Sequence, residues 1–231
     1  LGSGYLGLAA ISILVNIITL GLLVGLAFRR FPLRAQSWRL DWSLQLRMLA
    51  ISYPLMLNHL LATVFWQIDV PLLRQYNGEA VVGWYNAAYK WVNAFNVIPS
   101  FFTFALFPIL SRQVHTSLDD ARRTFRLSVK LLVLVALPLA ALVTWLANFM
   151  IGALGGAEFL PDGAIALRLV IWSIPIGWIN SVTNYMIISL GLERRLTLAF
   201  ILGVSFNLIA NLIFLPRYSY VAASLVTILS E

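Results

Sequence analysis

Apolar runs long enough to cross a lipid bilayer constrain the fold of this chain more than any other feature. A hydrocarbon core about 30 Å thick needs about 20 apolar residues in a helix, and helices can span it because they bond their own backbone groups. Six such runs are predicted, with a seventh cut short: about 5–28, 48–73, 81–110, 127–151, 164–190 and 196–215. The sequence therefore predicts an all-α, polytopic transmembrane helix bundle, and we expect it to be an internal fragment of a longer membrane protein.

Composition excludes several other classes of protein. Of 231 residues, 61% are hydrophobic and 11% are charged, whereas soluble domains carry about 25% charged residues. No cysteine is present, which excludes disulfides, thiolate metal sites and cysteine nucleophiles. The two histidines, His59 and His115, are too few for a histidine-rich metal centre. We therefore predict no metal and no cofactor.

Basic residues give the chain a net charge of +7, and they lie in short patches between the spans. Twelve lysines and arginines follow the first, third and fifth spans, and three follow the others. The positive-inside rule then places segments 29–47 and 112–130, together with Arg194, on the cytoplasmic side of a cytoplasmic (inner) membrane. Segment 29–47 is also amphipathic, and we expect it to lie along an anionic membrane surface. Membrane lipids are the expected partners, and nucleic acid is not.

A polar stripe distinguishes the third span. Asn86, Lys90, Asn93, Val97, Ser100 and Thr103 fall on one helical face, with Tyr89 and Asn96 at its margin. We interpret this face as the lining of a polar cavity, because charges within a membrane are costly. In the alternative interpretation, the amides only bond neighbouring helices and Lys90 extends along its stem to the interface.

Other polar residues accompany this stripe. Asp69 lies near the end of the second span, and Arg74 follows it. Asn180 and Asn184 recur at helical spacing in the fifth span. His59 is more often expected to be a buried, hydrogen-bonded histidine than a proton carrier.

Several short motifs resemble a known family. In the first half they are Asp69, Asn77-Gly78, Gly83-Trp84-Tyr85, Ala88-Tyr89-Lys90 and Ala105-Leu106-Phe107-Pro108. Near the end they are Gly191-Leu192-Glu193-Arg194, Asn207 to Asn211, Leu215-Pro216-Arg217-Tyr218 and Ala222-Ala223-Ser224. Together these resemble the oligosaccharide (O-antigen/polysaccharide) flippases of the multidrug, oligosaccharidyl-lipid and polysaccharide exporter superfamily. One departure is that Val70 follows Asp69, where family members often place a basic residue.

The resemblance implies a transporter of two six-helix lobes, twelve to fourteen helices in all, that works by alternating access. Residues 1–28 would then be the last helix of the N-terminal lobe, 29–47 a cytoplasmic linker and 48–231 an incomplete C-terminal lobe. The implied substrate is an oligosaccharide linked to polyprenyl pyrophosphate, flipped across the membrane for cell-surface polysaccharide biosynthesis. Other polysaccharide-assembly proteins are further implied partners.

The resemblance also suggests roles for individual residues. Lys90 would attract the pyrophosphate, with Arg74 as an outer helper. Asp69 would pair with Lys90 in the empty state or titrate as a coupling residue. The remaining residues would contact the glycan: Asn86, Asn93, Asn180 and Asn184 through hydrogen bonds to hydroxyls, and Trp84, Tyr85 and Tyr89 by stacking on sugar rings.

Two alternatives compete with the flippase. A multidrug or organic-cation antiporter of the same fold would have a cavity dominated by acidic residues. A membrane-bound oligosaccharide polymerase or ligase would carry a large extracytoplasmic loop with catalytic residues. The corresponding loop, 152–163, has twelve residues and no base or nucleophile constellation, and no GxSxG, HExxH or P-loop motif occurs. We therefore predict that the chain is not an enzyme and has no catalytic residues.

Overall fold

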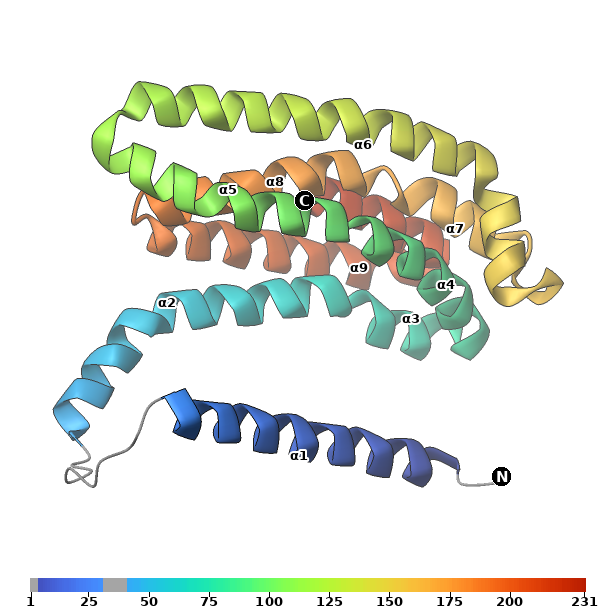
Figure 1. The fold of residues 1–231 in the computed structure, drawn as a ribbon. Coiled ribbons are helices and arrows are strands. Elements are labelled where there is room, and N and C mark those ends of the chain that lie inside the picture. The colour runs from blue at the N-terminus through green and yellow to red at the C-terminus, as the bar shows by residue number, and fades with distance from the viewer. Residues whose placement is uncertain (1–3, 31–40) are drawn as a thin grey trace. The chain divides into compact units, whose positions relative to one another are not determined.

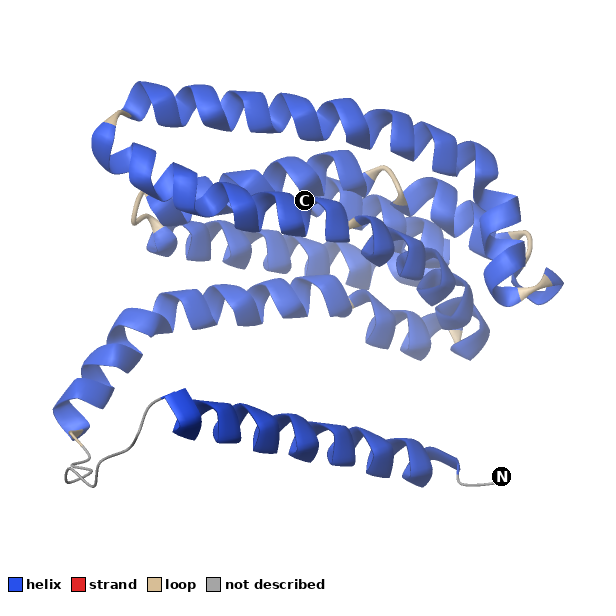
Figure 2. Ribbon diagram, in the orientation of Figure 1, coloured by secondary structure: helices blue, strands red, loops and turns tan. Residues whose placement is uncertain are grey.

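Helices form all the regular secondary structure in the part of the chain that the structure describes. The structure is a computed structural model that describes residues 4–30 and 41–231. In these residues Figure 2 shows helices joined by short loops and no strand. Six helical segments are long and apolar enough to cross a membrane. The predicted all-α, polytopic membrane bundle is thus confirmed.

Two compact units, residues 1–48 and 49–231, make up the chain. In the first unit, α1 (Gly4–Arg30) is a single helix with two arginines in its last turn. Residues 31–40, the middle of the predicted amphipathic linker, lie outside the described residues. The position of that linker on a membrane surface therefore remains a prediction, as does the assignment of the units to two lobes.

Asp41 forms the N-cap of α2 (Trp42–Gln67). Its Oδ1 atom accepts hydrogen bonds from the Ser43 hydroxyl at 2.8 Å and from the backbone N–H groups of Ser43 at 2.9 Å and Leu44 at 3.1 Å. These bonds satisfy donors that the first turn of a helix leaves unpaired. They also favour the ionised carboxylate, and the Ser43 hydroxyl contributes most to holding the pKa of Asp41 below its ordinary value.

The second unit continues α2 from Leu49 and adds the remaining helices (Figure 1). They are α3 (Asp69–Asn77), α4 (Glu79–Phe95), α5 (Val97–Thr116), α6 (Leu118–Gly155), the short 3-10 helix η1 (Ala157–Phe159), α7 (Asp162–Val170), α8 (Ser173–Ser189) and α9 (Glu193–Ser230). The Asn77-Gly78 motif forms the turn between α3 and α4, because α3 ends there and Gly78 has φ +85°. Such a positive φ favours glycine.

Three of the predicted spans are each divided into two helices at a proline. A proline cannot donate a hydrogen bond to the carbonyl four residues earlier, and its ring crowds that carbonyl. Each break lies three residues before a proline. The breaks are Ile68 before Pro71, Asn96 before Pro99, and Trp172 before Pro175. Not every proline breaks a helix, since Pro108 and Pro138 lie within the continuous helices α5 and α6.

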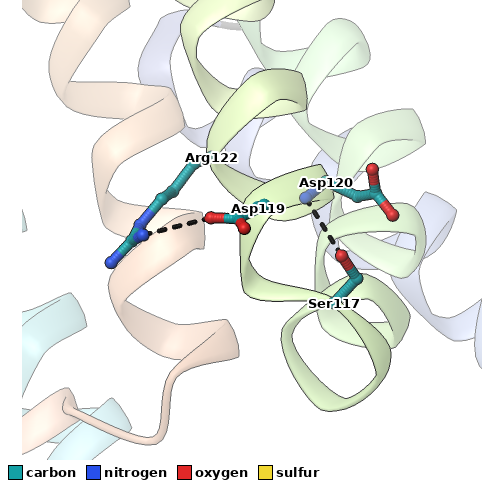
Figure 3. A network of polar contacts seen from close by, with 4 residues as sticks. All are labelled: Ser117, Asp119, Asp120 and Arg122. Carbon is teal, nitrogen blue, oxygen red and sulfur yellow. Dashed lines mark hydrogen bonds and ion pairs between the residues drawn. The ribbon is translucent and has the colours of Figure 1, made fainter.

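Segment 112–130, which the sequence predicts to lie on the cytoplasmic side, is helical except at Ser117. α5 extends to Thr116 and α6 begins at Leu118, so that only Ser117 separates the two helices. Figure 3 shows the Ser117 hydroxyl accepting a hydrogen bond from the Asp120 backbone at 3.3 Å, and an ion pair between Arg122 and Asp119 at 3.2 Å. The Ser117 side chain thus caps the start of α6. The charged residues of segment 112–130 therefore lie at the end of α5 and the start of α6, and not in a loop.

A kink divides α9 into two helical parts. Ser219 has φ 52° and ψ −140°, which is not helical. Residues after it run back alongside the first part of the helix, since the Asn207 amide donates to the Ser230 hydroxyl at 3.0 Å. The apolar residues that follow the sixth predicted span therefore form a separate helical part, which begins after the kink at Ser219.

The pair α7 and α8 occupies the centre of the second unit. It packs against α4 and α5, α6 and α9. Half of its most apolar window is buried, compared with at most 28% for any other span. Trp178 on α8 is fully buried among these helices, and Ala136 and Ala140 on α6 face the same core. Small residues at such a contact allow two helix backbones to approach closely.

Candidate functional site

Asp69 is the centre of a buried hydrogen-bond network in the second unit. It is the first residue of α3, directly after the break at Ile68, and only 2% of its surface is exposed. Its Oδ2 atom accepts from the Tyr85 hydroxyl at 2.8 Å and the Thr227 hydroxyl at 3.0 Å. Its Oδ1 atom accepts from the Asn211 amide at 2.7 Å. A carboxylate in a membrane is costly unless it is bonded in this way.

Two chains of polar groups extend from this carboxylate. On one side, the Tyr85 and Tyr89 hydroxyl oxygens lie 3.1 Å apart, and the Tyr89 hydroxyl lies 3.3 Å from the Thr227 hydroxyl. On the other side, the Asn211 amide also donates to the Asn207 carbonyl oxygen at 2.9 Å. Side chains from α3, α4 and both parts of α9 are thereby joined. This network can hold these helices in one arrangement, and a change at Asp69 would reach all of them.

A polar cavity of about 550 Å³ lies beside this network. Amide and hydroxyl side chains from α4, α5 and α8 line one part of it: Asn93, Asn96, Ser100, Asn180, Ser181 and Asn184. Apolar side chains of α2 and α9, among them Phe65 and Phe200, line another part. Convergent polar groups in a largely apolar cavity are typical of a ligand site.

Asn96 has a special place in the cavity wall. It is the residue at the break between α4 and α5, and its side-chain oxygen accepts a hydrogen bond from the indole N–H of Trp178 at 3.1 Å. Because Trp178 is fully buried, its hydrogen bond fixes the orientation of the Asn96 amide from the protein interior. The break caused by Pro99 thus brings a polar side chain to the cavity.

The predicted polar stripe is divided between the cavity and an exposed surface. Asn93 and Ser100 line the cavity, while Asn86 and Lys90 lie on the exposed face of α4. Thr103 is buried, and its hydroxyl donates to the Pro99 carbonyl at 2.7 Å. The stripe therefore reaches the cavity at Asn93 and Ser100 and ends before Thr103.

Other predicted site residues occupy different surroundings from one another. Asn180 and Asn184 line the cavity, as a polar site requires. Arg74 is exposed and pairs with Glu79, with 3.0 Å between Nε and Oε1. Tyr89 is partly buried in the Asp69 network, and Tyr85 is only 1% exposed. In this conformation the Tyr85 ring has no open face on which a sugar could stack.

Asp69 and Lys90 do not form the pair expected for the empty state. The Asp69 oxygens are bonded by Tyr85, Asn211 and Thr227, while Lys90 lies on the exposed face. Neutral donors thus take the place of the predicted cation. Hydroxyl and amide partners satisfy a buried carboxylate without the desolvation of a second charge.

Reasoning from the sequence missed the partners of Asp69. Thr227 lies in the last apolar residues of the chain and carries no motif, and Asn207 and Asn211 are recognisable only as part of a motif shared with a family, one turn apart. Their spacing does carry a signal, because two amides on one face of an apolar helix need a polar partner. Nothing in the sequence links that face to Asp69, which lies 142 positions before Asn211.

Comparison with known proteins identifies the family. Residues 1–162 match the family model described as "Polysaccharide biosynthesis protein". The chain belongs to this family. The match covers more than half of the chain and confirms the resemblance to polysaccharide flippase-type proteins. No curated protein and no solved structure matches.

Family membership gives a role in polysaccharide biosynthesis to a chain whose described helices can cross a membrane several times. The matched residues include Asp69, the α4 stripe and Asn96, whereas Asn180, Asn211 and Thr227 lie beyond residue 162. Among residues 4–30 and 41–231, no three His, Cys, Asp or Glu side chains are close enough to hold a metal ion. The chemistry that the site offers is therefore hydrogen bonding by amides and hydroxyls, with Lys90 as a nearby cation.

Proposed function

We propose that this chain is part of a transporter that flips a polyprenyl-pyrophosphate-linked oligosaccharide across the cytoplasmic membrane by alternating access. Membership of the polysaccharide biosynthesis family and the multi-pass helices support a membrane role in that process. In this proposal the second unit contributes one wall of the translocation pathway. Segments 29–47 and 112–130 and Arg194 lie on the cytoplasmic side, by the positive-inside rule.

The observation that carries the proposal is the continuity of the α4 stripe with the polar cavity. Asn93 belongs to both, and Lys90 and Asn86 lie one and two turns before it on the same helix face. A cation exposed in the middle of a membrane span is costly against lipid. We infer that this face borders water and substrate, with a second lobe on the other side.

The residues suit a ligand with an anionic and a hydroxylated part. Lys90 would contact the pyrophosphate, and Arg74, which is exposed, would attract it from outside. Asn86, Asn93, Asn180 and Asn184 would exchange hydrogen bonds with sugar hydroxyls. Amides serve this purpose because each can both donate and accept.

Asp69 is proposed as the coupling residue. A change in its charge would weaken or strengthen the bonds from Tyr85, Asn211 and Thr227, which come from α4 and the two parts of α9. These helices also carry cavity residues. Occupation or protonation of Asp69 can therefore change the shape of the cavity through contacts that are already in place.

Surface glycan export tests the proposal. The full-length protein would be expressed in a flippase-deficient host as wild type, Lys90→Met and Lys90→Arg, at matched membrane levels, with Leu106→Ala as a packing control. We expect Lys90→Met to lower export at least tenfold, since a charge-assisted bond contributes about 1.5–3 kcal/mol. Lys90→Arg, which keeps the charge, should retain most export. Normal export by Lys90→Met would refute the role of Lys90 in transport.

One observation favours a second candidate, an organic-cation antiporter of the same fold. The described lining of the cavity contains the carboxylate of Glu231 and no lysine or arginine. A cavity of this kind attracts cations more than anions. Efflux of a fluorescent organic cation, measured in the same strains, separates the two functions. Loss of efflux in Glu231→Gln with unchanged glycan export would favour the antiporter.

A further inference from the structure

A basic groove lies on the N-terminal part of α6, far from Asp69 in the sequence. Arg122, Arg126 and Lys130 recur at intervals of four residues and line a cavity of about 360 Å³ with Phe125, Val129 and Met186. Residues four apart lie on one face of a helix. Met186 comes from α8, and Phe125 and Met186 also pack against the hydrophobic core. The groove therefore has an apolar floor fixed to the bundle and a cationic rim.

Charge is not balanced within this groove. Arg122 pairs with Asp119 at 3.2 Å, as Figure 3 shows. Among the described residues, neither Arg126 nor Lys130 has an acidic partner within ion-pair distance. Both side chains are exposed. The positive charges of Arg126 and Lys130 are therefore both available to an anionic ligand.

The depth of Arg126 and Lys130 in the membrane limits which ligands the groove can bind. After Lys130, α6 has 25 residues without a charge, from Leu131 to Gly155. A helix of that length spans about 37 Å, compared with about 30 Å for a hydrocarbon core. Lys130 therefore lies at the boundary between hydrocarbon and headgroups, and Arg126 lies one turn outside it.

The face below the groove is apolar and exposed. Leu134, one turn after Lys130, is 70% exposed, and Trp145 further along is 79% exposed. Such side chains on a membrane helix are those that contact lipid chains. The groove thus combines cations at headgroup level with a row of apolar side chains that leads into the bilayer.

We propose that this groove binds the phosphate of an anionic phospholipid. Arg126 and Lys130 hold the phosphate oxygens, Phe125, Val129 and Met186 contact the glycerol backbone, and an acyl chain lies along Leu134. Arg122, which is neutralised by Asp119, contributes less. Basic sites between membrane helices recognise headgroups in this manner. The proposal does not depend on what the protein transports.

Lipid binding to the purified full-length protein tests the groove. The dissociation constants of phosphatidylglycerol and phosphatidylcholine with identical acyl chains would be measured by native mass spectrometry. The test variant is Arg126→Gln with Lys130→Gln. The matched control is Arg112→Gln with Arg123→Gln, which removes the same charge from two exposed residues outside the groove. Size-exclusion profiles would establish that both variants are folded.

We expect phosphatidylglycerol to bind wild type and control alike, and about thirtyfold more weakly to the test variant, from the usual contribution of a basic residue near a membrane surface. Equal weakening in the control would show that overall charge decides binding, and would overturn the groove. Equal affinity for phosphatidylcholine would overturn the preference for an anionic headgroup. Displacement of phosphatidylglycerol by a polyprenyl pyrophosphate, dependent on Arg126 and Lys130, would assign the groove to the transported lipid instead.

Discussion

The Asn211 amide donates to the Asp69 carboxylate at 2.7 Å, although the two residues lie 142 positions apart in the chain. Both are buried, at 0% and 2% exposure. This bond joins the start of α3 to the middle of α9, and it is one of three bonds that satisfy the carboxylate. In an apolar environment, the loss of such a partner costs more than the bond itself contributes, because the remaining group stays buried and unsatisfied.

Replacement of Asn211 by leucine should therefore destabilise the protein. The Oδ1 atom of Asp69 would lose its donor, and we expect the free energy of unfolding to fall by about 1–3 kcal/mol. The thermal midpoint of the purified full-length protein in detergent measures the effect. Asn148→Leu makes the same chemical change at an exposed position of α6 and should leave the midpoint unchanged. An equal shift in both variants would contradict the role given to Asn211.

The sequence predicts the helices of this protein well because their signal is local. Runs of apolar residues mark the spans, Ser117 marks the start of α6, and Gly78 marks the turn between α3 and α4. Each of these depends on residues within one or two helical turns. The breaks at Ile68 and Asn96 could also be located more closely, from the missing proline hydrogen bonds.

The candidate site was harder to predict because its contacts are distant in sequence. Helical periodicity places Lys90 on a polar face, but it cannot show which helix that face meets, and it gives no partner for Asp69. In the structure, Asn211 and Thr227 donate hydrogen bonds to Asp69, and Lys90 is exposed. Pairing across helices depends on the packing of α3 against α9, which a single sequence does not reveal.

Gly155 should tolerate no side chain. A Cβ atom at this position would lie 2.6 and 2.7 Å from the Cδ2 and Cγ atoms of the Phe159 ring. That ring packs against the hydrophobic core, so it cannot move without loss of contacts. We expect Gly155→Ala to lower the free energy of unfolding by about 1–3 kcal/mol, as measured by chemical denaturation in detergent micelles.

Two further variants make the test of Gly155 specific. Gly152→Ala adds the same methyl group in the same helix at an ordinary distance, 3.7 Å from Leu160, and should be nearly neutral. In the double variant Gly155→Ala with Phe159→Ala, the clash disappears, so the two changes should cost less together than the sum of their separate costs. Strict additivity would show that the ring and the glycine do not interact.

Asp41 should stabilise the start of α2 in a pH-dependent way. Hydrogen bonds from Ser43 and Leu44 lower its pKa in the folded state below the ordinary value of 3.8. The cap is therefore fully effective above about pH 4 and is lost as the pH falls through the folded-state pKa. At pH 6, hydrogen exchange in the first turn of α2 should be faster in Asp41→Ala than in wild type.

Measurements at lower pH test the sign of this effect. The ratio of exchange rates between Asp41→Ala and wild type at each pH cancels the intrinsic pH dependence of exchange. We expect this ratio to fall toward one as the pH drops below 3.8, because the carboxyl group is then protonated in both the folded and the unfolded state. With the non-titrating Asp41→Asn as the reference in place of wild type, the ratio for Asp41→Ala should not change with pH. A ratio for Asp41→Ala that rises on acidification would contradict the cap.

Pro99 should determine the angle between α4 and α5, and through it the shape of the cavity. In Pro99→Ala the new backbone N–H can bond to the carbonyl of Phe95, which removes the cause of the break at Asn96. Asn96 would then become part of a continuous helix, and its bond to Trp178 would be strained or lost.

Spin labels at residues 80 and 115 should move apart in Pro99→Ala as the two helices straighten. Pro108→Ala, within the continuous α5, should leave that distance unchanged. Asn93, Asn96 and Ser100 line the cavity on both sides of the break. Pro99→Ala should therefore also lower glycan export at matched expression. An unchanged distance between the labels, together with normal export, would show that packing against α8, and not Pro99, sets the angle.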